Sequence, residues 1–215
     1  MQSAGSLRFP RSPLLFVVLL AAGMNACLDL SRGYVERCQY ALEVRRDPSP
    51  DSNGAPLSTA VLGVRPFVAG PGLDGPGLVY RVAEARYESD FYHEFFVPPS
   101  DFVTTALRRW MADAGLFQAV VEPGALTETD YVIDGCVSRL LGDYRDRPEA
   151  QLELQIFLTH FGEKGPEIAF HREYTEIEPL REKDPEELVA AFRRALARIL
   201  SRCESDLRTL LAEAG

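Results

Sequence analysis

A cysteine near the N-terminus carries the strongest chemical signal in this chain of 215 residues. Arg8 and Arg11 precede an apolar run at residues 14–22, and the small residue Ala26 stands directly before Cys27. This order is typical of a secretory signal peptide, and a cysteine at its end is the residue that receives a diacylglyceryl group in bacterial lipoproteins. The pattern predicts lipid attachment to the Cys27 thiol. Cleavage by an ordinary signal peptidase, which leaves a plain thiol, is the alternative.

The apolar run also determines how the chain is held at a membrane. It contains about ten residues, whereas a helix needs about twenty to cross the hydrocarbon layer, so we expect no permanent span. Acyl chains on one cysteine hold a protein at a bilayer, because each buried methylene contributes about 0.8 kcal/mol. We therefore expect a signal peptide at residues 1–26, a lipidated N-terminus and tether at residues 27–38, and one domain at residues 39–215.

Other reactive residue types lack the arrangement that a catalytic or cofactor site needs. Residues 70–75 match the glycine pattern of dinucleotide-binding loops, but they lead into a predicted strand, whereas that motif opens a helix. His93, His160 and His171 have no metal-ligand spacing, although His160 and His171 could face each other across a predicted hairpin and form a chance zinc site. We expect no enzyme, no cofactor and no metal.

Charge and cysteine content limit the partners and the compartment. The net charge is −9, and an acidic surface repels phosphate backbones, so we expect no nucleic-acid partner. Cys38, Cys136 and Cys203 remain beside the lipidation site, in a compartment where disulfides persist. One disulfide with one free thiol and three buried thiols both remain open, and Cys203 lies on the apolar stripe of a predicted helix.

Hydrophobic periodicity predicts the elements that carry these residues. Strands are expected at residues 39–45, 60–68, 78–83, 87–97, 117–121, 131–141, 150–160 and 167–174. One helix is expected from Ser100 as N-cap to Gly115, and a second, longer one begins at Asp184 with Glu187 completing a capping box. This order predicts a single-domain α+β fold, in which an antiparallel sheet carries two main helices on one face.

One predicted strand has aromatic residues on both of its faces. Phe91, Tyr92, Phe95 and Phe96 lie within six positions, and successive strand residues point to opposite sides of a sheet. Some of these rings therefore need a cover other than the main core. A helix on one side and a loop on the other would supply it. The functional alternative is a surface, formed by these four residues, that contacts another protein or lipid acyl chains.

The order of several short motifs resembles the ABC-type transport auxiliary lipoprotein family. The resemblance covers residues 40–211 and follows the cysteine of the signal peptide. The motifs are Val64-Arg65-Pro66-Phe67, Gly72-Leu73-Asp74-Gly75-Pro76, Leu78-Val79-Tyr80-Arg81, Pro98-Pro99, Ala114-Gly115-Leu116-Phe117 and Asp130-Tyr131-Val132-Ile133-Asp134-Gly135.

The resemblance implies a lipid-anchored protein of the outer membrane that faces the periplasm. Its partners would be an ABC permease, its ATPase and a substrate-binding protein of the MCE (mammalian cell entry) type, and the system would move phospholipid or other hydrophobic molecules between membranes. Leu28 follows Cys27, whereas aspartate at that place signals retention at the inner membrane, which favours outer-membrane sorting.

Two other function classes remain as alternatives. A structural lipoprotein that assembles or activates another envelope machine, such as a cell-wall synthase or a secretion pore, would have a similar small domain. A hydrolase would need a site assembled from residues that are distant in sequence. Recovery of an MCE protein, or of synthase or secretin subunits, with the lipidated protein distinguishes the first two classes.

Overall fold

The computed structural model describes residues 36–48, 55–122 and 124–214. The predicted signal peptide, Cys27 and most of the predicted tether lie outside these residues. Contacts divide the chain into two units, Met1–Glu36 and Arg37–Gly215, and the helices and strands named below all belong to the second. Cys38, the last residue of the predicted tether, already belongs to the first strand. None of the helices in the described ranges combines the length and apolarity that crossing a membrane requires.

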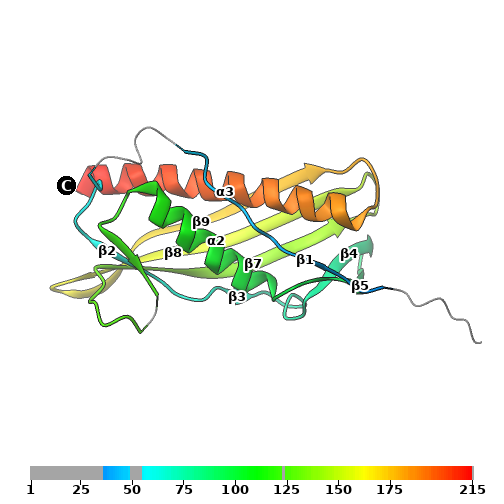
Figure 1. Cartoon of the computed structure of the whole chain (residues 1–215), viewed down its shortest axis with the longest axis horizontal. Coiled ribbons are helices and arrows are strands. Elements are labelled where there is room, and N and C mark those ends of the chain that lie inside the picture. The colour runs from blue at the N-terminus through cyan, green and yellow to red at the C-terminus, as the bar shows by residue number, and fades with distance from the viewer. Residues whose placement is uncertain (1–35, 49–54, 123, 215) are drawn as a thin grey trace, which may run out of the picture. The chain divides into compact units, whose positions relative to one another are not determined.

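The described part of this second unit forms a nine-stranded mixed sheet and two helices (Figure 1). The strands are β1 (Cys38–Tyr40), β2 (Val61–Val64), β3 (Val68–Ala69), β4 (Gly77–Ala83), β5 (Arg86–Phe95), β6 (Ala119–Val121), β7 (Tyr131–Asp143), β8 (Glu149–Gly162) and β9 (Gly165–Pro179). The helices are α2 (Pro99–Ala114) and α3 (Pro185–Ala214).

The long strand β7 organises the sheet. On one side it pairs antiparallel with β8, which pairs antiparallel with β9. On the other side β2, β3 and β4 pair with successive stretches of β7, and all three run parallel to it. The prediction of an antiparallel sheet was therefore wrong. The chain reaches β7 from β2, β3 and β4 only after α2, and such crossovers produce parallel neighbours.

Both helices lie on the same side of the sheet, as predicted (Figure 1). Helix α3 contacts β8 and β9, while α2 contacts β2, β3, β6 and β7. Strand β8 supplies alternate buried side chains, as its periodicity predicted, and these form the core beneath α3. They are Ala150, Leu152, Leu154, Ile156 and Leu158. The core therefore lies between the helices and one face of the sheet.

The helix ends agree only partly with their predicted signals. Gly115 ends α2 in the left-handed conformation, as expected, but the helix begins at Pro99, so the prediction that Ser100 is the N-cap was wrong. For α3, the Asp184 carboxylate accepts the Glu187 backbone N–H at 2.8 Å, as predicted. The Glu187 carboxylate does not close a capping box, because it accepts the backbone N–H groups of Arg181 and Glu182 instead.

The first predicted strand is much shorter than the pattern at residues 39–45 suggested. After β1 the chain leaves the sheet as a segment without strand pairing, which we call the strap (residues 41–47). Leu42 of the strap is buried in the main core, and the carbonyl of Glu43 accepts a hydrogen bond from Arg193 Nε of α3 at 3.0 Å. The strap thus continues from the edge of the sheet onto the helices.

Candidate functional site

Strand β5 carries a large, irregular β-bulge at the aromatic residues that the sequence analysis identified. Ser89 pairs with Val79 and Glu94 pairs with Gly77, so residues 90–93 stand opposite Leu78 alone. Such an insertion removes backbone from the ladder and re-aims the side chains that it carries. We call residues 90–93 the β5 bulge. A side chain at Gly77 would not fit, because its Cβ would lie 2.7 Å from the backbone oxygen of Asp90.

The Asp90 carboxylate holds the bulge in shape. Its Oδ1 accepts the backbone N–H groups of Tyr92 at 2.8 Å and His93 at 3.0 Å, as aspartates do in tight turns. Its Oδ2 accepts the Tyr80 hydroxyl at 2.9 Å and lies 2.9 Å from Nδ1 of His93. Burial raises the pKa of Asp90, but these hydrogen bonds outweigh burial and hold the pKa below its usual value. These partners all lie on β4 and β5, so the ionised carboxylate ties the bulge to the neighbouring strand.

The bulge exposes the aromatic rings of Phe91 and Tyr92. Phe91 is 67% exposed and Tyr92 is 41% exposed, and their rings meet edge to face with centroids 5.3 Å apart. The Arg37 guanidinium lies 4.9 Å from the centre of the Phe91 ring, within the range of a cation–π contact. Phe96, after the end of the strand, is 69% exposed.

Phe95 does not belong to this surface, and its assignment to a partner contact was wrong. It is 1% exposed, and its ring packs against Phe102 of α2 and Phe192 of α3. The strand has resumed its regular alternation by this position, so Phe95 points into the core and Phe96 does not. Of the four candidate residues, the structure brings Phe91 and Tyr92 together and leaves Phe96 exposed next to β1, since its N–H donates to the Tyr40 carbonyl at 2.9 Å.

The N-terminal segment joins the sheet directly beside the bulge. Strand β1 runs parallel to β5, with Cys38 opposite His93. Two side chains from this segment donate to the buried carboxylate of Glu94, Arg37 at 2.6 Å and Gln39 at 2.9 Å. The chain that follows Cys27 in sequence therefore enters the domain next to the exposed aromatic rings.

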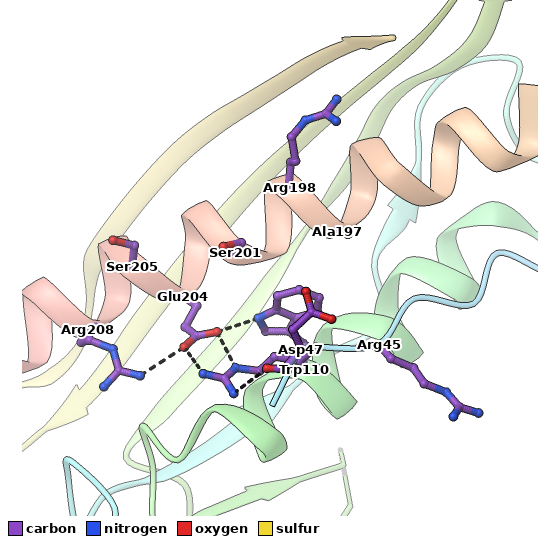
Figure 2. A pocket seen from close by; sticks show the side chains of 10 residues that line it. Arg45, Asp47, Trp110, Ala197, Arg198, Ser201, Glu204, Ser205 and Arg208 are labelled. Atoms are coloured by element: carbon purple, nitrogen blue, oxygen red, sulfur yellow. Dashed lines mark hydrogen bonds and ion pairs between the residues drawn. The ribbon is translucent and has the colours of Figure 1, made fainter. Parts of the chain in front are cut away.

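The other end of the strap is fixed at Glu204 of α3. Both carboxylate oxygens of Glu204 accept hydrogen bonds from Arg46, each at 2.8 Å. Trp110 Nε1 of α2 donates at 2.8 Å and Arg208 donates at 3.1 Å, as Figure 2 shows. Burial raises the pKa of Glu204, but these donors outweigh it and hold the pKa below its usual value. We call this cluster the Glu204 latch (Arg46, Trp110, Glu204 and Arg208).

A pocket of about 470 Å³ opens beside the latch and contains several arginines. Figure 2 shows that Arg45 and Arg198 point away from Glu204. Arg198 contacts Glu176 and Glu178 of β9 instead, while Arg46 and Arg208 bind Glu204. The positive charges that face the carboxylate are thus already paired with it. The arrangement joins the strap to both helices.

The remaining candidate residues are placed apart from one another. In the β8–β9 hairpin His160 stands opposite Glu167 and His171 opposite Phe157, so the two histidines do not face each other as a chance zinc site would require. Within residues 36–48, 55–122 and 124–214, no group of three potential metal ligands occurs. Residues 70–75 form the loop between β3 and β4, with no helix after them.

The three cysteines of the domain are free thiols. Cys38 and Cys136 are half-buried on strands, and Cys203 is buried on α3, as its position on the apolar stripe predicted. Burial raises the pKa of Cys203 to about 12, so this thiol stays protonated at neutral pH.

The Glu204 latch was not found from the sequence. Arg46 and Glu204 are 158 positions apart, and no local pattern links these two charged residues. The one available signal was a carboxylate directly beside Cys203 on the apolar stripe of α3. Charged residues at the margin of a buried stripe need a partner, but the sequence does not name it.

Comparison with known proteins identifies relatives of this fold. A family model described as ABC-type transport auxiliary lipoprotein component matches residues 40–202. A crystal structure from Xanthomonas campestris, of the family-model DUF330, is 23% identical, superposes with a TM-score of 0.70 and covers 82% of this chain and 98% of its own. That of an uncharacterized protein is 14% identical, with a TM-score of 0.63 and coverages of 80% and 98%. At these identities the likeness is one of fold. No curated protein matches the chain.

Proposed function

The chain belongs to the family of ABC-type transport auxiliary lipoprotein components, and from this membership we propose that it is an outer-membrane lipoprotein that faces the periplasm. In this proposal it serves an ABC transporter of the MCE type, which moves phospholipid or other hydrophobic molecules between membranes. It acts as a non-enzymatic accessory component. The observation that carries the proposal is the family match, which extends from β1 into the second half of α3.

The lipid anchor of this proposal is Cys27. The signal-peptide pattern ends at this cysteine, and the described domain begins ten residues later, at Arg37. Leu28 follows the cysteine, and this supports sorting to the outer membrane. The residues between Cys27 and β1 then serve as a tether between the acyl chains and the sheet.

A non-enzymatic role is supported by how the polar clusters use their atoms. The Asp90 carboxylate accepts its hydrogen bonds from within β4 and β5, and the Glu204 carboxylate accepts from three side chains of the same domain. A general acid or base needs a proton site within reach of a substrate. Both carboxylates are instead held ionised by groups that fix the fold.

Three measurements test the proposal. Globomycin blocks lipoprotein signal processing, so the precursor should accumulate in treated cells, and mass spectrometry of the native protein should find acyl chains on Cys27. A Cys27→Ser variant serves as the unlipidated control. Crosslinking of the membrane-bound protein, followed by affinity purification, should recover an MCE protein together with its permease and ATPase. Recovery of cell-wall synthase or secretin subunits in their place would reject the transporter role.

A further inference from the structure

We propose that the β5 bulge is a membrane-contacting surface, which places Phe91 and Tyr92 in the interfacial layer of the phospholipid leaflet that holds the Cys27 acyl chains. This inference rests on the lipid anchor of the proposed function and adds the part of the domain that faces the bilayer. Four observations carry it: the position of the bulge beside β1, the chain length to the anchor, the exposure of the rings and the local charge.

The covalent chain limits how far the bulge can lie from the anchor. Ten peptide units separate Cys27 from Arg37, and a fully extended residue spans at most about 3.6 Å, so the two lie no more than about 36 Å apart. Arg37 itself contacts the Phe91 ring and the Glu94 carboxylate. The anchor therefore keeps this end of the domain within about 36 Å of the lipidated cysteine, which allows the bulge to reach the bilayer.

The far end of the sheet is less constrained, because it lies a strand's length from the point where the chain enters the sheet. Strand β4, the partner of β5, pairs with Gly142 and Asp143 at the end of β7. At the far end, the backbone N–H of Phe161 donates to the backbone carbonyl of Asp130, which stands just before the start of β7. Thirteen residues of β7 lie between these points, which is about 43 Å of strand. Figure 1 likewise places β1, β4 and β5 at the end of the domain opposite the C-terminus of α3.

The side chains suit the interface between lipid headgroups and acyl chains. Phe91 is apolar, and Tyr92 combines an apolar ring with a polar hydroxyl, the combination enriched where membranes meet water. The bulge holds both rings outward without help from a partner, because Asp90 fixes its backbone and Gly77 lets the neighbouring strand approach closely. The rings are thus presented to the bilayer in advance of contact.

The carboxylates at the bulge are bound within the domain, although the chain as a whole is acidic. The chain carries a net charge of −9, which an anionic leaflet repels. Of the two carboxylates at the bulge, Glu94 pairs with Arg37 and accepts from Gln39, whereas Asp90 stays ionised but uses both of its oxygens as acceptors within β4 and β5. Approach of Phe91 and Tyr92 to lipid therefore brings neither carboxylate to the headgroups without hydrogen-bond partners.

The test places a fluorescent reporter at the bulge of the full-length lipidated protein. Phe91→Trp is compared with the matched control Phe161→Trp, since Phe161 is an exposed phenylalanine at the far end of β7. Each protein is reconstituted into vesicles of phosphatidylethanolamine and phosphatidylglycerol with brominated acyl chains, and the emission of the buried Trp110 is subtracted using the unsubstituted protein. We expect brominated lipid to quench Phe91→Trp at least twofold more than Phe161→Trp.

The outcomes separate this inference from the proposed function. Equal quenching of both variants, in protein that floats with the vesicles and carries acyl chains, overturns the membrane surface and leaves the lipid anchor standing. If Phe91→Trp becomes shielded only when an MCE protein is added, the bulge contacts that protein, and the membrane surface is overturned. Absence of acyl chains on Cys27 in the native protein refutes the anchor, and with it the membrane surface.

Discussion

Two carboxylates, Glu94 and Glu204, fix opposite ends of the same N-terminal segment with nearly the same chemistry. Each accepts hydrogen bonds from an arginine of that segment and from an uncharged N–H donor, Gln39 in the first case and Trp110 in the second. The arginines differ in their surroundings. The Arg37 side chain is 50% exposed, whereas the Arg46 side chain is 9% exposed.

This difference indicates that the two ends have different tasks. An ion pair with one exposed partner contributes little to stability, because water solvates that partner nearly as well and can take its place beside the other. A buried pair is costly to break, because the partner left behind keeps its charge without water. The Glu204 latch therefore stabilises the attachment of the strap to the helices. The pair at Glu94 orients the entering chain beside the β5 bulge and leaves the neighbouring aromatic rings accessible.

The largest expected effect is that of Glu204→Ala. The substitution removes the carboxylate that accepts from the buried Arg46 guanidinium and from Trp110 Nε1, so we expect a loss of about 3–5 kcal/mol in the free energy of unfolding. Urea unfolding followed by circular dichroism measures it, with Arg37→Ala as the control for an exposed pair. A loss below about 1 kcal/mol would contradict a stabilising role for the latch.

Asp90→Ala tests the bulge itself, and we expect an intermediate effect. The variant removes the acceptor of two backbone N–H groups and of the Tyr80 hydroxyl. Hydrogen bonds to a charged group contribute about 1.5–3 kcal/mol, and we expect a loss of about 2 kcal/mol on unfolding. Amide hydrogen exchange at Tyr92 and His93 should become faster while exchange in α3 is unchanged. Unaltered protection at the bulge would show that Asp90 does not order it.

These two regions also show what the sequence can and cannot predict. Helix α3 and strand β8 were predicted closely, because one buried face gives a long, regular period. Whether a strand runs parallel or antiparallel to β7 could not be predicted. The strands β2, β3 and β4 precede α2 and β7 follows it, and no local pattern shows which of them pair with β7. The β5 bulge was not predicted either, because it interrupts a regular period. Strict alternation puts Phe91 and Phe95 on one face, but the residues inserted opposite Leu78 break that alternation, so Phe91 is exposed and Phe95 is buried.

Acid should weaken the Glu204 latch, and we expect the resulting loss of stability to be smaller than the loss caused by Glu204→Ala. The pKa of Glu204 is lowered from its ordinary value of 4.5 in the folded state, so the unfolded chain binds the proton first. Stability from this group is therefore present above about pH 4.5 and is lost as the pH falls through the folded pKa. Glu204→Gln should flatten this acid limb in unfolding curves measured between about pH 6 and pH 3. An acid limb as steep as that of the unsubstituted protein would assign the dependence to other carboxylates.

The smallest expected effect is that of Arg37→Ala, and it sharpens the contrast between the two ends. Removing this arginine leaves Glu94 with the Gln39 hydrogen bond and with access to water where the guanidinium stood. We expect a loss of at most about 1 kcal/mol in urea unfolding. Arg46→Ala under the same conditions should cost several times more, because Arg46 is the more buried partner. Equal losses for the two variants would mean that burial does not set the strength of these contacts, and that the entering chain is held as firmly at the bulge as at the latch.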